Sequence, residues 1–171
     1  MHRSSTLLKV LSPFILFAGC APSQYGTATG TRFNLCEPLV VTPDATDTAD
    51  QLDGINQAMA LWNQAAGAHL SMPGDPAAGA DPATIPLHFQ AAATNFHGLY
   101  DPQAVQVFIN VNLTGHQLVV TIAHELGHPY GLVHIPPSER LSVMNPANLT
   151  VEPTSDDVAA LDAIWGTCQT Q

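Results

Sequence analysis

An eleven-residue segment that begins at His124 constrains this chain more than any other feature, and it reads His-Glu-Leu-Gly-His-Pro-Tyr-Gly-Leu-Val-His. Residues four apart on an α-helix lie one above the other on the same face. His124 and His128 can therefore direct two imidazoles toward one point, about one helical turn in depth. Two histidines at this spacing on a helix are typical of a metal site.

The rest of the segment supplies the other parts of such a site. Glu125 follows the first histidine, where its carboxylate can reach a water on the metal rather than the metal itself. Gly131 can end the helix in a left-handed conformation and turn the chain back, because glycine has no Cβ to oppose it. His134 then arrives as a third ligand. Three imidazoles with one open position indicate a catalytic zinc site, whereas a structural site would be closed by a fourth ligand such as cysteine.

The pattern His-Glu-x-x-His-x-x-Gly-x-x-His, followed by Ser-Val-Met-Asn-Pro at residues 142–146, resembles the metzincin zinc endopeptidases with their methionine turn. The Ser-x-Met-x-Pro form and the close of the chain, Asp157-Val158 to Ile164-Trp165-Gly166, are most similar to the matrixin branch, the catalytic domains of matrix metalloproteases. The resemblance implies an α+β, zincin-like fold. Its parts would be a twisted, mostly parallel sheet with an antiparallel edge strand, a zinc-binding active-site helix, a methionine turn and a C-terminal helix.

The resemblance also implies roles for single residues beyond the zinc ligands and Glu125. Met144 would lie beneath the metal as an apolar floor, although an ordinary core methionine would pack in the same way. Residues 145–148 would form a wall of the pocket for the substrate side chain beyond the scissile bond. Asp157 would bond the backbone near the methionine turn, as the corresponding acid does in the family, or serve only its own helix.

The N-terminus has the features of an export signal. Basic Arg3 and Lys9 precede an apolar run that ends at Gly19-Cys20, and this run is too short to span a membrane. Its last residues resemble the lipobox of bacterial lipoproteins, which predicts a lipid on Cys20; plain signal cleavage or a buried anchor is the alternative. We expect a signal peptide over 1–19, a Gly- and Ser/Thr-rich tether over 20–31 and a catalytic domain over 32–171, placed in the bacterial cell envelope or secreted.

The charge of the mature chain excludes one class of partner. Removing residues 1–19 leaves two cations against fourteen carboxylates, a formal charge of −12. Nucleic acid is not an expected partner, because phosphate binding needs a basic patch. The expected partners are a protein or peptide substrate and, through the lipid anchor, a membrane. We expect the protein to be a monomer.

With Cys20 lipidated, Cys36 and Cys168 remain as an even pair in an oxidising compartment, and we predict that they form a disulfide. The alternative is that Cys36 is an inhibitory thiolate on the zinc, as matrixin propeptides provide. The sequence Asn-Leu-Cys-Glu-Pro around Cys36 departs from that motif, and few residues precede the first strand.

Periodicity predicts the other elements. Arg32–Val41, interrupted by Pro38, suits an edge strand. A helix should run from a cap at Asp47 or Thr48 to Gly67, with its apolar face formed by Leu52, Ile55, Met59, Trp62 and Ala66. Strands are expected at 85–89 and 105–113, a surface loop at 71–84, the central helix at 117–131 and a last helix at 155–165, with Val158, Leu161, Ile164 and Trp165 on its buried side.

Other metal sites have less support. The three-residue spacing of Asp44, Asp47, Asp50 and Asp53 lacks the alternate-residue pattern of a calcium loop and favours a solvated helix start. Matrixins carry structural zinc and calcium near the loop 71–84, but this sequence has no His-x-Asp pattern there. The remaining histidines are expected to be ordinary surface or core residues, and they are His69, His88, His97 and His116.

The sequence therefore predicts a zinc endopeptidase in which Glu125 is the general base. The alternative is a catalytically inactive metzincin-fold lipoprotein that serves as a binding or adhesion module. In the fold that the resemblance implies, an edge strand before the zinc helix binds substrate by strand addition, and either Ala104–Leu113 or Phe96–Tyr100 suits that role.

Overall fold

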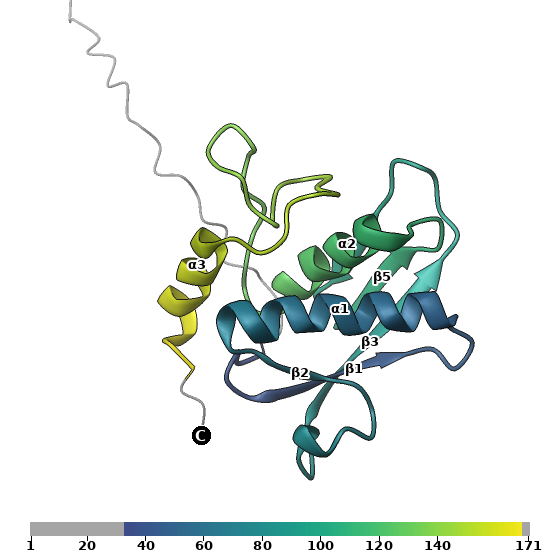
Figure 1. Cartoon of the computed structure of the whole chain (residues 1–171), viewed down its shortest axis with the longest axis horizontal. Coiled ribbons are helices and arrows are strands. Elements are labelled where there is room, and N and C mark those ends of the chain that lie inside the picture. Colours follow the sequence, from purple (N-terminus) through teal and green to yellow (C-terminus); the bar gives the residue numbers. More distant parts are fainter. Residues whose placement is uncertain (1–32, 169–171) are drawn as a thin grey trace, which may run out of the picture.

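The computed structural model describes residues 33–168, in which two helices cover one face of a five-stranded sheet (Figure 1). The strands are β1 (Pro38–Pro43), β2 (His69–Ser71), β3 (Ala83–Gln90), β4 (Gly98–Asp101) and β5 (Gln106–Asn110). They are arranged in the order β2-β1-β3-β5-β4, and every pair is parallel except β4 with β5. The helices are α1 (Ala49–Ala66), α2 (Gly115–Gly127) and α3 (Ser155–Trp165), with a short 3₁₀ helix, η1 (Pro76–Ala78). This is the predicted α+β arrangement, a mostly parallel sheet with one antiparallel edge strand.

The prediction of an edge strand over Arg32–Val41 is wrong in its position within the sheet. β1 pairs with β2 on one side and with β3 on the other, so it is an interior strand. Pro38 and Pro43 are tolerated because they stand at its two ends, where a missing amide disrupts little of the hydrogen-bond ladder. The second neighbour, β2, was not predicted from the sequence because only three residues form it.

Helix α1 confirms the predicted caps. The Thr48 side chain accepts a hydrogen bond from the Gln51 amide, the Gln51 side chain reaches back to the Thr48 amide, and Gly67 ends the helix at φ +64°. The predicted apolar face is buried except for Leu52, which is half-buried. The buried Trp62 indole donates to the carbonyl of Ala123 at 2.8 Å, which joins α1 to α2.

The central helix starts earlier and ends earlier than the predicted range of 117–131. It begins at Gly115 and ends at Gly127, so Pro129 lies beyond it and removes none of its hydrogen bonds. Every residue from Leu118 to Gly127 is buried, as the apolar sequence predicted. None of the helices within residues 33–168 has the length and apolar character that a membrane span requires.

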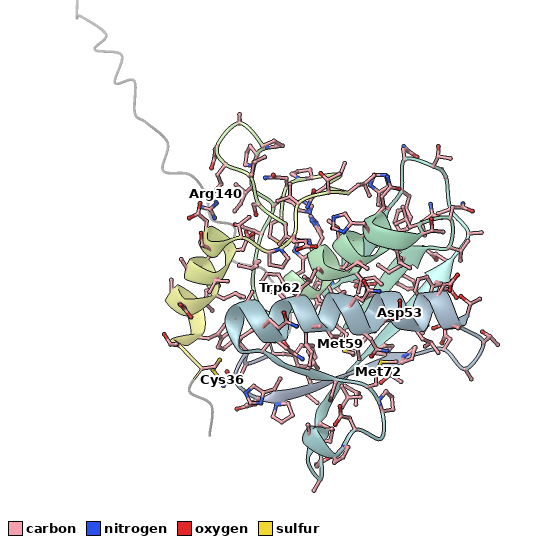
Figure 2. The ribbon with its side chains drawn as sticks, in the orientation of Figure 1. Cys36, Asp53, Met59, Trp62, Met72 and Arg140 are labelled. Carbon is pink, nitrogen blue, oxygen red and sulfur yellow. A yellow bond between two sulfur atoms is a disulfide. The ribbon has the colours of Figure 1, made fainter. Side chains whose placement is uncertain are left out.

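Helix α3 matches its predicted range, and the chain after it is joined to the start of the domain. Cys36 and Cys168 form the predicted disulfide, drawn in Figure 2, with their Cα atoms 5.2 Å apart. Bonded in this way, Cys36 offers no thiolate to a metal. Leu161 is buried, but Ile164 is 39% exposed, so its predicted place on the buried side is wrong.

Candidate metal centre

Three histidines come together at the end of α2 and the turn that follows it. His124 lies in the last turn of the helix, His128 is the residue that caps it, and His134 comes from the loop beyond. One ring nitrogen from each lies within 4.8 Å of the other two, and no other group of this kind is found among residues 33–168. The loop turns back through Gly131, which has a φ of +99°.

Backbone carbonyls fix which nitrogen each helical histidine presents. His124 donates from Nδ1 to the carbonyl of Val143 at 2.7 Å, and His128 donates from Nδ1 to the carbonyl of Leu132 at 2.9 Å. A carbonyl can only accept, so Nδ1 carries the proton and Nε2 keeps its lone pair. Both Nε2 lone pairs are thereby left free for a metal.

The three rings fit a zinc ion. The Nε2 atoms of His124 and His134 lie 3.0 Å apart. Two ligands of a tetrahedral zinc with bonds of about 2.1 Å are separated by about 3.4 Å, so the two rings need to move apart by only a few tenths of an ångström. Burial lowers the pKa of His124 and of His128 to about 4, which keeps both rings neutral and able to ligate near neutral pH.

Glu125 lies beside the histidines at the base of a cleft. Its side chain is buried, and burial raises the pKa of its carboxyl to about 8, opposed by a hydrogen bond from the backbone of Tyr100 that lowers the pKa. A carboxyl held near neutral pKa can both accept and release a proton.

Gly98, at the start of β4, leaves the space that the Glu125 side chain occupies. A Cβ built on Gly98 would lie 2.8 Å from both Cγ and Oε1 of Glu125, and 3.0 Å from Cγ2 of Thr121. A side chain here would displace the carboxylate, since contacts this short do not occur between ordinary atoms. β4 therefore fixes Glu125 from one side, while α2 carries it from the other.

Met144 is fully buried. Its sulfur would be 2.7 Å from a Cβ on Gly127, so the thioether packs directly on the backbone at the end of α2. The adjacent backbone is held by Asp157, which is also fully buried and accepts hydrogen bonds from the Ser142 hydroxyl and the Val143 amide. Asp157 thus bonds the methionine turn, the first of the two roles considered for it.

A cleft lined by His124 and His134 has a volume of about 190 Å³. One side is formed by residues 95–98, which lead into β4, and the floor by Thr121, His124 and Glu125 of α2. The other side is formed by Pro146, Ala147 and Asn148, three of the four residues predicted for this wall, whereas Asn145 is buried and does not line the cleft. β4 is the outermost strand next to this cleft, whereas β5 lies inside the sheet, so of the two candidate segments only Phe96–Tyr100 reaches the edge.

Several other predicted residues lie away from the metal centre. Tyr130 is fully buried, and Trp165 donates to its backbone carbonyl, so it is a packing residue. Asp44 pairs with His88 at 2.9 Å, and Asp47 bonds the amide of Asp44, which places these acids in the turn before α1.

His97 lines the cleft, a position that the sequence did not predict. The expected lipidation site, Cys20, lies outside the described residues.

Two contributions to the site have no recognisable signal in the sequence. The Val143 carbonyl orients His124 through its backbone, and Gly98 acts by lacking a side chain. Helices and strands are predicted from the pattern of apolar and polar side chains. That pattern records neither the hydrogen bond of a backbone carbonyl nor the space left by a missing side chain.

No protein-family model matches the sequence, and a comparison with curated proteins finds no match. Among solved structures, the chain is similar to high choriolytic enzyme 1, a hatching-enzyme zinc protease from the medaka fish Oryzias latipes. The identity is 12%, the alignment covers 83% of this chain and 96% of that one, and the TM-score is 0.51. Myroilysin is similar at 17% identity over 87% of this chain and 74% of its own, with a TM-score of 0.45. The sheet, the group of three histidines and this structural likeness together identify the fold as the metzincin α+β fold.

Proposed function

We propose that this chain is a zinc-dependent endopeptidase of matrixin-like type that hydrolyses peptide bonds of proteins outside the cytoplasm. The observation that carries the proposal is the convergence of three histidine Nε2 atoms beside a buried glutamate in an open cleft. His124, His128 and His134 would hold the ion. A bound zinc would polarise the scissile carbonyl and make a water nucleophilic at neutral pH.

The protein groups around the ion would then handle the proton and the substrate. Glu125 would take the proton of the attacking water and pass it to the amide nitrogen of the leaving group. The Tyr100 backbone and Gly98 would keep its carboxylate aimed at the cleft. The outer edge of β4 would bind the substrate backbone as an added strand, with Pro146, Ala147 and Asn148 against the next side chain.

We further propose that the mature protein is exported and held at a membrane by a lipid on Cys20. The Cys36–Cys168 disulfide supports an oxidising compartment, because such bonds rarely persist in a reducing cytosol. Metabolic labelling with a radioactive fatty acid tests the anchor: the label should enter the wild-type chain and be absent from Cys20→Ala. Labelling of both chains would place the lipid elsewhere, and labelling of neither would remove it.

Casein cleavage by the purified mature protein tests the activity. Cleavage should disappear with 1,10-phenanthroline and return when zinc is added. Glu125→Gln should bind zinc as the wild type does and cleave at least about 10³-fold more slowly, because it lacks the proton acceptor. Glu139→Gln, in an exposed loop, is the matched control and should cleave normally. Zinc binding without cleavage of casein or of a peptide library would favour the inactive binding module.

A further inference from the structure

The Val143 carbonyl, which orients His124, has a second hydrogen-bond donor. Nδ2 of Asn148 donates to the same oxygen at 3.1 Å, beside the 2.7 Å bond from Nδ1 of His124. The position of this oxygen therefore depends on a side chain four residues beyond the methionine. Because the oxygen sets the direction of the His124 ring, whatever holds the oxygen also holds the ring.

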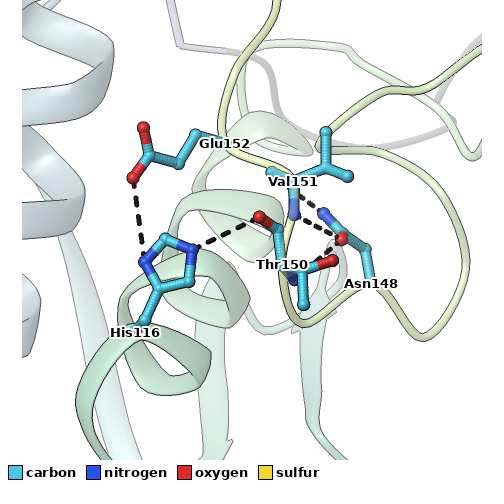
Figure 3. A network of polar contacts seen from close by, with 5 residues as sticks. All are labelled: His116, Asn148, Thr150, Val151 and Glu152. Atoms are coloured by element: carbon cyan, nitrogen blue, oxygen red, sulfur yellow. Dashed lines mark hydrogen bonds and ion pairs between the residues drawn. The ribbon is translucent and has the colours of Figure 1, made fainter.

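The Asn148 amide is fixed by the loop that surrounds it (Figure 3). Its Oδ1 accepts from the amides of Thr150 and Val151, at 3.1 and 2.9 Å, while its Nδ2 donates to the Val151 carbonyl at 2.6 Å and to Val143. Only one orientation of the amide places the oxygen toward the N–H groups and the nitrogen toward the carbonyls. The side chain therefore has no alternative rotamer that preserves these bonds.

The same residue belongs to the wall of the cleft. Pro146, Ala147 and Asn148 form that wall, and Ala147 has a φ of +58°, a left-handed conformation that is unfavourable for a residue with a side chain. Such a conformation persists only where neighbouring bonds enforce it. A backbone hydrogen bond from the Asn148 amide to the Asn145 carbonyl spans Ala147, and the Asn148 side chain binds the chain on both sides of the wall.

The far side of this loop has a separate anchor on α2. Nε2 of His116 lies 3.3 Å from the Thr150 carbonyl, and its Nδ1 lies 3.7 Å from the Glu152 carboxylate, as Figure 3 shows. This anchor holds the loop but makes no contact with Val143 or His124. It therefore offers a way to loosen the loop while leaving the oxygen that orients the ligand in place.

We propose that Asn148 is a positioning residue with two effects. It aligns the His124 ring for metal binding, and it fixes the position of the wall of the substrate cleft. The inference rests on the proposed function for the identity of the metal ion and of the cleft. Losing the donor half of the amide would free the Val143 oxygen and the ring that depends on it. Second partners of this kind typically change metal affinity by about 10- to 100-fold when they are removed.

Zinc affinity, measured by competition with a chromophoric chelator on the mature protein, tests this proposal without relying on activity. Asn148→Asp keeps the acceptor oxygen for Thr150 and Val151 but replaces the donor with a second oxygen that repels the Val143 carbonyl. We expect its zinc affinity to fall by about tenfold or more. Asn148→Ala should show a loss in the same direction, and it decides the matter should the aspartate variant fail to fold. The visible absorption of the Co²⁺-loaded variants should also shift, because the His124 ring turns.

His116→Ala is the matched control. This variant releases the other anchor of the loop. Its zinc affinity should change by less than about twofold, and its Co²⁺ spectrum should match that of the wild type. Its KM for a peptide substrate should rise. An equal loss of zinc affinity in His116→Ala would show that general loosening of the loop is the cause, and would overturn the proposal. Unchanged affinity in both Asn148 variants would overturn it as well. Casein cleavage by the wild type reports separately on the proposed function.

Discussion

Asp157 in α3 accepts a hydrogen bond from the backbone amide of Val143 at 3.0 Å, and the carbonyl of the same Val143 accepts a hydrogen bond from Nδ1 of His124. The last helix is thus connected to a histidine of the candidate metal centre through the single residue Val143. The buried Asp157 carboxylate also accepts from the Thr154 amide and hydroxyl at the start of its own helix. One side chain therefore caps α3 and holds the turn.

Changing Asp157 to Asn should destabilise the protein strongly. The amide keeps one acceptor oxygen, but its NH2 group would face the N–H and O–H donors that bond the carboxylate in the wild type. We therefore expect a loss of about 2–3 kcal/mol in the free energy of unfolding. Urea unfolding of the zinc-loaded protein measures it. Asp156→Asn, at the exposed neighbouring position, is the control and should stay within about 0.5 kcal/mol. Equal effects at both positions would remove the special role of Asp157.

Gly98→Ala should impair hydrolysis without removing the metal. The added Cβ would meet Glu125 at 2.8 Å, so the carboxylate must move. Displacement of a catalytic group by about 1 Å costs on the order of 10²-fold, and we expect that loss in kcat/KM on a peptide substrate with zinc content unchanged. Normal activity in this variant would show that the Glu125 position is not critical.

The Glu125 contribution to the stability of the metal-free protein should fall as the pH rises. Glu125 releases its proton near pH 4.5 in the unfolded chain, whereas burial raises its pKa to about 8 in the folded one. Between these values the folded state binds more protons at Glu125, so this group lowers the free energy of unfolding as the pH rises, while the lowered pKa values of His124 and His128 act in the opposite direction up to about pH 6.5. Glu125→Gln lacks this titration. The stability difference between the variant and the wild type should therefore grow from about pH 5 to 8, and urea unfolding in the presence of a chelator measures it. A constant difference would contradict the buried state of Glu125.

Removing the disulfide should destabilise the fold. The bridge joins residues 132 positions apart, and in the chain-entropy model a loop of that length contributes up to about 5 kcal/mol. The double variant Cys36→Ser, Cys168→Ser should lose about 2–5 kcal/mol of unfolding free energy, and a reductant should lower the wild type by a similar amount. A wild type whose unfolding curve is unaffected by the reductant would show that the bridge carries no such stabilisation.

The sequence was sufficient for the parts of the site that depend on local spacing. His124 and His128 share a helical face because of the helix period, and Gly131 turns the chain because its φ is positive. Helix α1 and its caps followed from the same kind of local signal. Each of these features is decided within about four residues of itself.

Features that depend on distant neighbours were not accessible in this way. Pro38 predicts an edge strand, but a proline fits the edge of a sheet and the end of a strand equally well, and only the pairing of β1 with β2 and β3 shows which applies. Likewise, the Val143 carbonyl accepts hydrogen bonds both from Asn148, in the same loop, and from His124, on the separate helix α2. Backbone carbonyls carry no sequence signature, so such a contact is visible only in the fold.

X-ray absorption at the zinc edge of the metal-loaded protein tests the central claim most directly. We predict a four-coordinate ion with three imidazole nitrogens at about 2.0–2.1 Å and one oxygen from solvent. His134→Ala should lose one imidazole from this set. An ion without imidazole ligands, or a spectrum that is unchanged in His134→Ala, would contradict the three-histidine site on which the proposed hydrolysis depends.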